Sequence, residues 1–459
     1  MNTAPPAQLA SEGRPSIVSS TPPPRHSTTR PLPPRLRRRG GAYALVVGIA
    51  FLATVMGLSV LLVSQYAGRN SGLSNDSAEA EALAQSAVEY AMTRTAADPL
   101  WRYTYQNNHE TTPIPLGRGT IAYKFVDVAD GDLTNNTNGE PVRVYGIGRV
   151  GKATRVYSVS MAATQPLNSL QTVMDAGGNI DLGLTTLTGS GIVSANGTIS
   201  AVTALLGNLT MEAVAALNLG SSSGSGSRTS GVAPRALPDP VHAFDWYLAN
   251  GTVIPLTAIP GPGTAKVVKF RLFSPASNPF GGQPNAYGVY VIDCQGASIT
   301  VSQCRVVGTL VLLNTTTAST IQDSNYFAPT SNNAASLLVR GDITIAMTGT
   351  ALADNGATGD AYVGAINFNP AGTPYNGASD ATYATTYPSE IDGAVYISGN
   401  LVTNSAPAFV GSVLIGSNVQ TSGSLSLNYS AIPYNSPPAG FKTSALVPIQ
   451  GTWVWEPSN

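Results

Sequence analysis

An uncharged stretch near the N-terminus limits what this chain of 459 residues can fold into. The 29 residues between Arg39 and Arg69 include no Asp, Glu, Lys or Arg. Their core, residues 42–67, reads AYALVVGIAFLATVMGLSVLLVSQYA. As an α-helix this core would extend roughly 39 Å, at about 1.5 Å per residue, and the hydrocarbon core of a bilayer is about 30 Å thick. The stretch therefore predicts one tilted transmembrane helix. A cleaved secretory signal, whose apolar region would be shorter, and a buried core helix are the alternatives.

Charge is distributed unevenly on the two sides of this stretch. Residues 1–41 hold seven Arg and one Glu, a net charge of +6, and the residues after the apolar core carry −7. Arg37, Arg38 and Arg39 directly precede the apolar core, so the positive-inside rule places the N-terminus in the cytoplasm. The body is then periplasmic or on the cell surface. A nucleic-acid-binding protein would carry its basic charge on the folded domain, so no nucleic-acid partner is expected.

Small residues recur four apart within the apolar segment. Ala44 pairs with Gly48, and Ala53 pairs with Gly57. Such spacing lets another helix approach closely in a membrane. These four residues are therefore candidates for membrane or filament helix packing, although Ala and Gly are also common in such helices.

The helical pattern continues beyond the apolar segment as an amphipathic half. An alanine-rich stripe with helical spacing predicts a face that packs on a globular domain. Ser74 or Asp76 could cap the start of this half, and Asp98-Pro99 should end it. The stripe comprises Ala80, Leu83, Ala84, Ala87, Val88 and Ala91.

Three short segments carry a family resemblance: Arg39-Gly40-Gly41-Ala42, Ala44-Leu45-Val46-Val47, and AEALAQSAVEYAM at 80–92. With them, residues 37–98 resemble the type IV pilin superfamily, specifically PilX-type pilus-assembly (minor pilin) proteins. The resemblance implies cleavage by a prepilin peptidase after Gly40 or Gly41, and cleavage after Gly41 would leave Ala42 as the mature N-terminus. The family usually has Glu five residues into the mature chain, where this chain has Val46 or Leu45.

The resemblance also implies a function. It predicts a pilin-like, membrane-anchored structural component of a type IV pilus or related filament or secretion apparatus, with inner-membrane lipid and other pilin-like subunits as partners. The alternatives are a permanently anchored β-solenoid adhesin that binds a surface ligand or glycan, and a polysaccharide lyase or hydrolase.

The expected fold is a long transmembrane and amphipathic helix followed by mainly β structure. Alternation at 119–128, 141–150 and 153–161 predicts an antiparallel meander, the order of parts in pilin-like domains. The body has short apolar runs broken by Gly, Asn and Ser corners, which favour a β-solenoid-like domain, with a β-sandwich as the alternative. Its low charge, part of a chain only 11% charged, suits such a coil. The phrase DGAVYISGNLV and the runs after it resemble, more weakly, C-terminal regions of PilX-like proteins.

These patterns divide the chain into six expected parts. They are a basic, Pro-rich arm or leader (1–39), the helix (40–98), the meander (99–165), an irregular β segment (166–265) with a Gly/Ser-rich linker (220–231), the solenoid-like domain (266–445) and a C-terminal tail (446–459).

Candidate chemical sites are few. Gly146-x-Gly148-x-x-Gly151 matches a dinucleotide fingerprint, but a strand follows it instead of a helix, so a strand and hairpin turn are expected. Gly220-x-Ser222-x-Gly224 matches a nucleophile elbow, but it lies in a low-complexity tract. Asp130-Gly131-Asp132 could hold Ca²⁺, although turn chemistry explains it as well.

Cysteine and histidine usage also bears on chemistry. Cys294 and Cys304 could form a disulfide in an oxidising compartment or remain two buried thiols. With three His in the chain and no paired carboxylates along a repeat, we expect no catalytic residue, no metal site and no cofactor.

Overall fold

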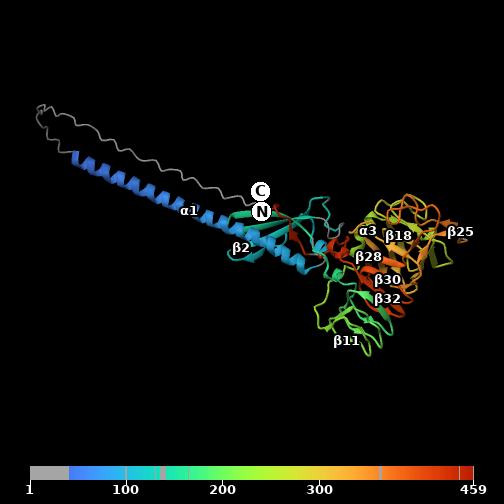
Figure 1. Cartoon of the computed structure of the whole chain (residues 1–459). Coiled ribbons are helices and arrows are strands. Elements are labelled where there is room, and N and C mark those ends of the chain that lie inside the picture. The colour runs from blue at the N-terminus through green and yellow to red at the C-terminus, as the bar shows by residue number, and fades with distance from the viewer. Residues whose placement is uncertain are drawn as a thin grey trace, which may run out of the picture. The chain divides into compact units, whose positions relative to one another are not determined.

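The computed structural model describes residues 41–98, 101–129, 131–134, 141–163, 165–360, 364–443 and 445–457. The chain divides into two compact units, Met1–Asn70 and Ser71–Asn459. The predicted class, a long N-terminal apolar helix followed by a large and mostly β region, is confirmed (Figure 1). The arm at 1–39 lies outside the described residues.

Helix α1 (Gly41–Ala97) is continuous over 57 residues. It passes through Gly68 and Gly72 without a break, so no second helix starts at Ser74 or Asp76. It ends before Asp98-Pro99, as predicted, because a proline ring disfavours the α conformation at the residue that precedes it.

The second half of α1 covers one face of an antiparallel sheet. The meander consists of β1 (Ile114–Leu116), β2 (Gly119–Asp127), β3 (Val142–Val150) and β4 (Ala153–Ala162), each paired antiparallel with the next. Short helix α2 (Trp101–Thr104) precedes them. The predicted stripe of α1 is buried in full, and it packs on Ile121, Tyr123, Phe125, Val142, Val144 and Val150 of the sheet.

Two glycines of β3 allow the helix to lie directly against the sheet. A Cβ on Gly146 would lie 2.7 Å from Val88 Cγ2 and would overlap the Ala84 carbonyl oxygen. A Cβ on Gly148 would lie 2.6 Å from the Ala84 backbone nitrogen and would overlap the Ala80 carbonyl oxygen. Since no side chain fits between the backbones, this part of the strand requires glycine.

The C-terminal segment completes the same sheet. We expected a tail at 446–459, but β33 (Val447–Pro448) and β34 (Val454–Glu456) both pair antiparallel with β4. Glu456 Oε1 lies 3.0 Å from Arg143 Nη2 of β3 and accepts a 2.6 Å hydrogen bond from Ser158 Oγ of β4. The described residues between β4 and β33 are therefore an insertion between neighbouring strands of one sheet.

The inserted region is built mainly from parallel strands; its antiparallel strand pairs among the described residues are β24 (Leu352–Ala353) with β27 (Thr386–Tyr387) and β25 (Asn355–Asp360) with β26 (Gly364–Ile366). Its entry and exit run side by side, since Pro166 bridges Lys442 and the Leu167 amide donates to the Phe441 carbonyl at 3.0 Å. Successive strands alternate between sides, so the chain winds as a coil. In spatial order the first side is β12 (Arg228–Ser230), β10 (Thr210–Ala213), β8 (Ile192–Ala195), β5 (Met174–Ala176), β30 (Ala408–Ile415), β28 (Glu390–Ile397), β22 (Ala335–Gly341), β19 (Thr309–Thr315), β16 (Val289–Asp293) and β13 (Thr252–Val253).

The second side follows the same spatial order, and the third side is given in the reverse direction, from the β13 end. The second comprises β11 (Leu217–Asn218), β9 (Ile199–Ser200), β6 (Ile180–Asp181), β31 (Val419–Thr421), β29 (Leu401–Thr403), β23 (Ile343–Met347), β20 (Thr320–Asp323), β17 (Ser298–Ser302) and β14 (Ala265–Lys269). The third includes β15 (Leu272–Phe273), β18 (Arg305–Val307), β21 (Tyr326–Ala328), β32 (Ser424–Tyr429) and β7 (Thr186–Ser190). Between β23 and β28 lie β24 (Leu352–Ala353), β25 (Asn355–Asp360), β26 (Gly364–Ile366) and β27 (Thr386–Tyr387). Short helices are η1 (Asn168–Gln171), η2 (His242–Phe244), α3 (Asp245–Asn250), η3 (Leu256–Ala258) and α4 (Ile432–Asn435).

The order of the strands shows that the coil starts in its middle. The chain enters at β5, winds outward to β12, crosses to β13 through residues 231–251, and winds back to β30 beside β5. Val413 of β30 pairs in parallel with Met174 of β5. The expected boundary at 265/266 therefore differs from the structure, because strands on both sides of it form one coil. The tract at 220–231 likewise contains β12 and the bridge between Leu205 and Ser223, so it forms part of the coil and is not a linker.

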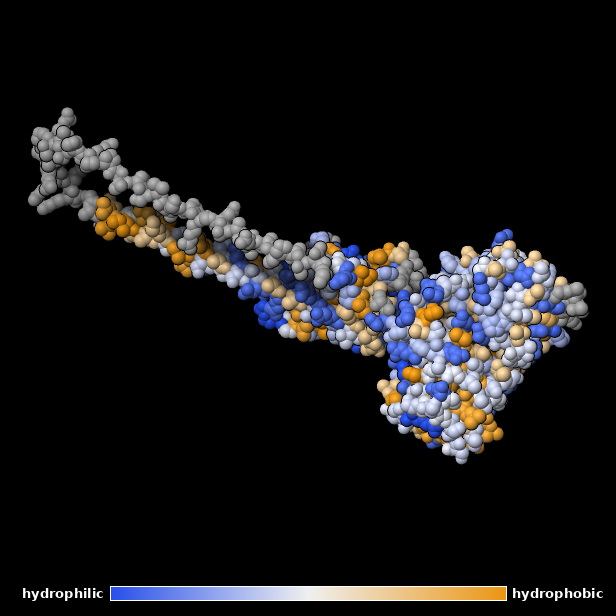
Figure 2. Space-filling view, viewed as in Figure 1, coloured by the Kyte–Doolittle hydropathy of each residue, from blue (hydrophilic) through white to orange (hydrophobic). Residues whose placement is uncertain are grey.

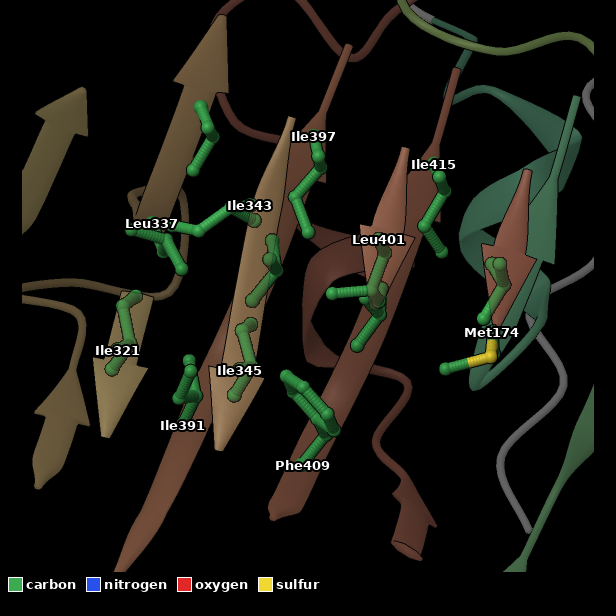
Figure 3. Close-up of a cluster of buried hydrophobic side chains, with 14 of the residues drawn as sticks. Met174, Ile321, Leu337, Ile343, Ile345, Ile391, Ile397, Leu401, Phe409 and Ile415 are labelled. Carbon is green, nitrogen blue, oxygen red and sulfur yellow. The ribbon is translucent and has the colours of Figure 1, made fainter. Parts of the chain in front are cut away.

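Aliphatic side chains in register fill the coil. Ile391 pairs with Phe409, Ile343 with Leu401, and Ile397 with Ile415 on neighbouring strands (Figure 3). All six belong to one buried cluster. Fully burying one such side chain contributes about 1.5–3 kcal/mol. The parallel backbone pairs hold the strands together without charged side chains, which agrees with the low charge of the sequence.

The contact between α1 and β3 leads to a first prediction. Gly148→Ala should lower the free energy of unfolding by roughly 1–3 kcal/mol, because its Cβ meets backbone atoms of α1 that cannot rotate away. Gly349→Ala is the matched control, since a Cβ there meets nothing within 4 Å, and it should change stability by less than about 0.5 kcal/mol. Denaturant unfolding of the detergent-solubilised protein measures both, and equal stability of the two variants would contradict this packing.

Candidate membrane and assembly helix

The first half of α1 exposes apolar side chains on all sides. One helix in the described residues, Tyr43–Ala97, is long and apolar enough to cross a membrane. Tyr43, Phe51 and Val60 are each more than two-thirds exposed. Apolar colour covers this part of α1 in the space-filling view (Figure 2). The surface is apolar enough for lipid, and no other part of the chain that the structure describes covers it.

Two hydroxyls in this half are satisfied by carbonyls of the helix itself. Thr54 Oγ1 donates to the Ala50 carbonyl at 2.7 Å, and Ser59 Oγ donates to the Met56 carbonyl at 2.8 Å. An unsatisfied hydroxyl would be costly in hydrocarbon, so these bonds lower the cost of insertion.

The predicted small residues all lie in α1 and are exposed. A Cβ added at Gly48 or Gly57 would meet no atom within 4 Å, so neither glycine is required by the protein's own packing. Ala44 and Ala53 are nine residues apart, which at about 100° per residue places them roughly half a turn apart on the helix surface. The two pairs therefore lie on opposite sides of α1. The spacing in the sequence was sufficient to predict this arrangement, but we did not predict it.

The predicted processing site lies at the edge of the described part. Arg37, Arg38, Arg39 and Gly40 fall outside the described residues. Gly41 is the first residue of α1, and Ala42 follows within the helix. Cleavage at Gly40 or Gly41 remains a prediction.

Polar contacts tie the second half of α1 to the sheet. Arg118 forms ion pairs with Glu79 and, at 3.5 Å, with Asp76. Arg155 Nη2 donates to Ser77 Oγ at 2.6 Å, and the Tyr157 hydroxyl donates to Glu81 at 3.2 Å. Asp76, Glu79 and Glu81 therefore help to position the helix. None of these contacts could be predicted from the sequence, because the partners are distant in the chain.

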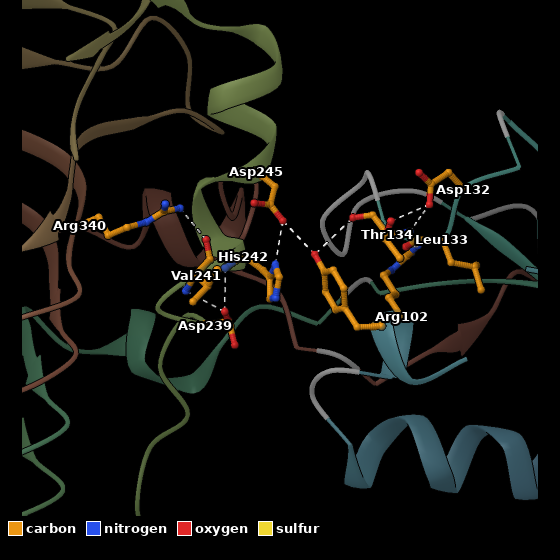
Figure 4. A network of polar contacts seen from close by, with 10 residues as sticks. Arg102, Asp132, Leu133, Thr134, Asp239, Val241, His242, Asp245 and Arg340 are labelled. Atoms are coloured by element: carbon orange, nitrogen blue, oxygen red, sulfur yellow. Dashed lines mark hydrogen bonds and ion pairs between the residues drawn. The ribbon is translucent and has the colours of Figure 1, made fainter. Parts of the chain in front are cut away.

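A second polar cluster joins the α2 region to the coil (Figure 4). Asp245 Oδ2 accepts a hydrogen bond from the Tyr103 hydroxyl at 2.9 Å and lies 3.0 Å from His242 Nδ1. The rings of Tyr103 and His242 stack at 3.8 Å. Burial and the Asp245 carboxylate raise the pKa of Tyr103, so the hydroxyl stays protonated as a donor. His242 begins η2 and Asp245 begins α3, and no pattern in the sequence indicated their contacts with Tyr103.

The other candidate motifs have structural explanations. Gly146 and Gly148 lie within β3 and Gly151 in the turn before β4, as predicted. Gly220, Ser222 and Gly224 lie in the coil. Asp132 hydrogen-bonds Thr134, and Asp130 lies outside the described residues. Among the described residues, no group of three or more His, Cys, Asp or Glu could hold a metal ion.

The two cysteines are free thiols and are both buried. The disulfide alternative is therefore wrong for this structure. Burial raises the pKa of each thiol to about 12. Cys304 Sγ also donates to the Ser302 carbonyl at 3.2 Å. Both belong to the buried cluster inside the coil, so they act as small core residues.

Comparisons with known proteins show little similarity. No protein-family model matches this sequence, and no curated protein matches it. The crystal structure of the competence-associated pilin ComZ from Thermus thermophilus is similar at 10% identity, with 83% of this chain and 97% of that chain covered and a TM-score of 0.23. A similarity at this level transfers no activity to the present chain.

The buried thiols provide a second prediction. Iodoacetamide at pH 8 should label neither cysteine of the folded protein, because each thiol is buried and its pKa is near 12. After denaturation without reductant, mass spectrometry should find both labelled. Cysteines that are labelled only after reduction would show a disulfide and contradict the structure.

Proposed function

We propose that this protein is a pilin-like, membrane-anchored structural component of a type IV pilus or a related filament or secretion apparatus, and that it displays the coil outside the inner membrane. One observation carries the proposal: α1 is a single helix with an exposed apolar first half and a second half fitted by glycines onto an antiparallel sheet. This is the order of parts that the resemblance to PilX-type proteins implies.

The exposed half suits two apolar environments in turn. In the bilayer its side chains contact lipid, and the stretch between Arg39 and Arg69 contains no charge that opposes insertion. In a filament the same side chains would contact helices of other pilin-like subunits. The small residues on opposite sides of α1 would then allow one neighbour on each side, since close helix approach requires small side chains.

Processing by a prepilin peptidase belongs to the same proposal. Cleavage after Gly41 would leave Ala42 at the mature N-terminus and remove the basic arm with Arg37, Arg38 and Arg39. Retention of the arm would keep a strong positive charge beside the membrane, which favours a permanent cytoplasmic N-terminus. Processing therefore determines whether the helix can leave the bilayer.

The role of the coil follows from its insertion between β4 and β33. Because its entry and exit meet at Pro166 and Lys442, the sheet closes without it. We infer that the coil is a displayed module with a structural, non-catalytic role. The alternative function, a permanent anchor for an extracytoplasmic coil that binds a surface ligand or glycan, rests on the same helix and differs in whether α1 leaves the membrane.

Fractionation of sheared cell-surface filaments tests the proposal. The protein should appear in the filament fraction, and mass spectrometry should find a mature N-terminus at Ala42 or Gly41. A Gly40→Leu, Gly41→Leu double variant should accumulate uncleaved in the inner membrane. A full-length chain found in membranes with an active prepilin peptidase, and never in filaments, would contradict assembly and support the permanent anchor.

Substitution of a small helix residue tests the packing role. Gly57→Leu should reduce incorporation into filaments by about tenfold, corresponding to about 1.4 kcal/mol per contact. It should leave the melting temperature unchanged, because a Cβ at Gly57 meets no atom of the protein. Leu58→Met, a swap of similar volume, is the matched control. Equal incorporation of both variants would show that Gly57 is not at a helix interface.

A further inference from the structure

The crossover segment (residues 231–251) runs along the outside of the coil and joins its two ends. Hydrogen bonds join it to two strands of the first side. The Tyr396 hydroxyl of β28 donates to the Pro238 carbonyl at 2.9 Å, and Arg340 Nη2 of β22 donates to the Val241 carbonyl at 2.9 Å. Phe244 and Tyr247 pack in a buried cluster with Leu414 and other outward side chains of this side. The segment therefore covers part of the outer face of the first side of the coil.

The N-terminal end of this segment is held by three side chains from other parts of the coil region. The Arg235 amide donates to Asn196 Oδ1 at 2.8 Å, and the Ala236 amide donates to Asn168 Oδ1 at 2.8 Å. The Arg235 guanidinium pairs with Glu212 of β10 at 2.8 Å and donates to the Asn168 carbonyl at 3.0 Å. These contacts fix the crossover segment beside the seam where β5 meets β30.

Asp175 lies at this seam. It is the central residue of β5, paired with Leu414 of β30 on one side and Ser194 of β8 on the other. Its side chain is fully buried, and neither carboxylate oxygen has a hydrogen-bond partner among the described residues. Burying an ionised carboxylate without a partner is costly, so this position disfavours a negative charge.

Only two charged groups act on Asp175 at appreciable strength. Arg235 of the crossover segment lowers its pKa and Glu212 of β10 raises it, while η1 and β30 contribute no titratable residue. Arg235 already forms an ion pair with Glu212. Burial is the largest influence on this carboxyl; it outweighs the Arg235 charge and raises the pKa of Asp175 to about 7.

We propose that Asp175 is a pH-sensitive latch that holds the crossover segment closed when protonated and loosens it when ionised. In the closed state the carboxyl of Asp175 is neutral and buried, and Arg235 pairs with Glu212. On ionisation the carboxylate competes with Glu212 for Arg235 or gains water, and either change displaces residues that carry the Asn196 and Asn168 contacts. The proton leaves to solvent, so the step needs no other reactant.

The direction of the pH effect follows from the sign of the shift. A carboxyl whose pKa is raised on folding stabilises the closed state fully below its unfolded pKa, near 3.8, and this stabilisation is lost as pH rises through about 7. The opening equilibrium should therefore rise by about thirtyfold between pH 5.5 and pH 8 and change little above that.

Hydrogen–deuterium exchange of the full chain in detergent tests the latch. The Arg235 and Ala236 amides should exchange about thirtyfold faster at pH 8 than at pH 5.5, after correction for the intrinsic pH dependence of exchange. Amides of β19, such as Leu312, serve as the internal reference and should keep their protection at both values.

Two variants separate the latch from a general loss of stability. Asp175→Asn keeps the shape of the side chain without its charge, so its Arg235 and Ala236 amides should stay protected at pH 8. Glu212→Gln frees Arg235 for Asp175, so it should shift the exchange transition to lower pH. Wild-type protection that does not change between pH 5.5 and pH 8, or an Asp175→Asn variant with the wild-type pH dependence, would overturn the proposal.

Discussion

A helix that buries only one half of its length in its own protein requires an apolar environment for the other half. The second half of α1 meets this requirement internally, since Ala80, Ala84 and Ala87 are fully buried against the sheet. Residues 43–73 have no such cover. Their apolar surface is favourable only in lipid or against other helices. The membrane anchor and the proposed assembly role both depend on this one property of α1.

The glycines of β3 explain how a thin sheet can support such a helix. Gly146 and Gly148 bring the backbones of α1 and β3 into direct contact, and Arg118, Arg155 and Tyr157 hold the helix by polar contacts around it. The C-terminal strands then complete the sheet beside β4. At the seam of the coil, burial raises the pKa of the Asp175 carboxyl to about 7.

Local patterns in the sequence predicted the helix, its buried stripe, its end at Asp98 and the meander correctly, because hydrophobic periodicity and proline act over a few residues. The sequence did not show that β33 and β34 join β4, because that pairing spans about three hundred residues. The permuted order of the coil was missed for the same reason: Val413 and Met174 are partners through space and not through a repeat. The Gly/Ser composition of 220–231 suggested a linker, although residues of this tract pair by their backbone with neighbouring strands of the coil. Of the candidate site, the residues of α1 could be found from spacing, whereas the contacts at Asp245 and Asp175 arise from tertiary structure alone.

Both roles require α1 to be one continuous helix whose first half is not covered by the described part of the chain and whose second half is buried on one face. Nitroxide scanning of residues 43–95 in lipid vesicles, with accessibility to oxygen and to a water-soluble nickel complex, measures this directly. We expect high oxygen accessibility at every position up to Ala67, and a 3.6-residue oscillation from Ala80 to Thr95 with minima at the alanine face. A break in helical periodicity at Gly68–Gly72, or a protected face within residues 43–67 of the isolated protein, would contradict it.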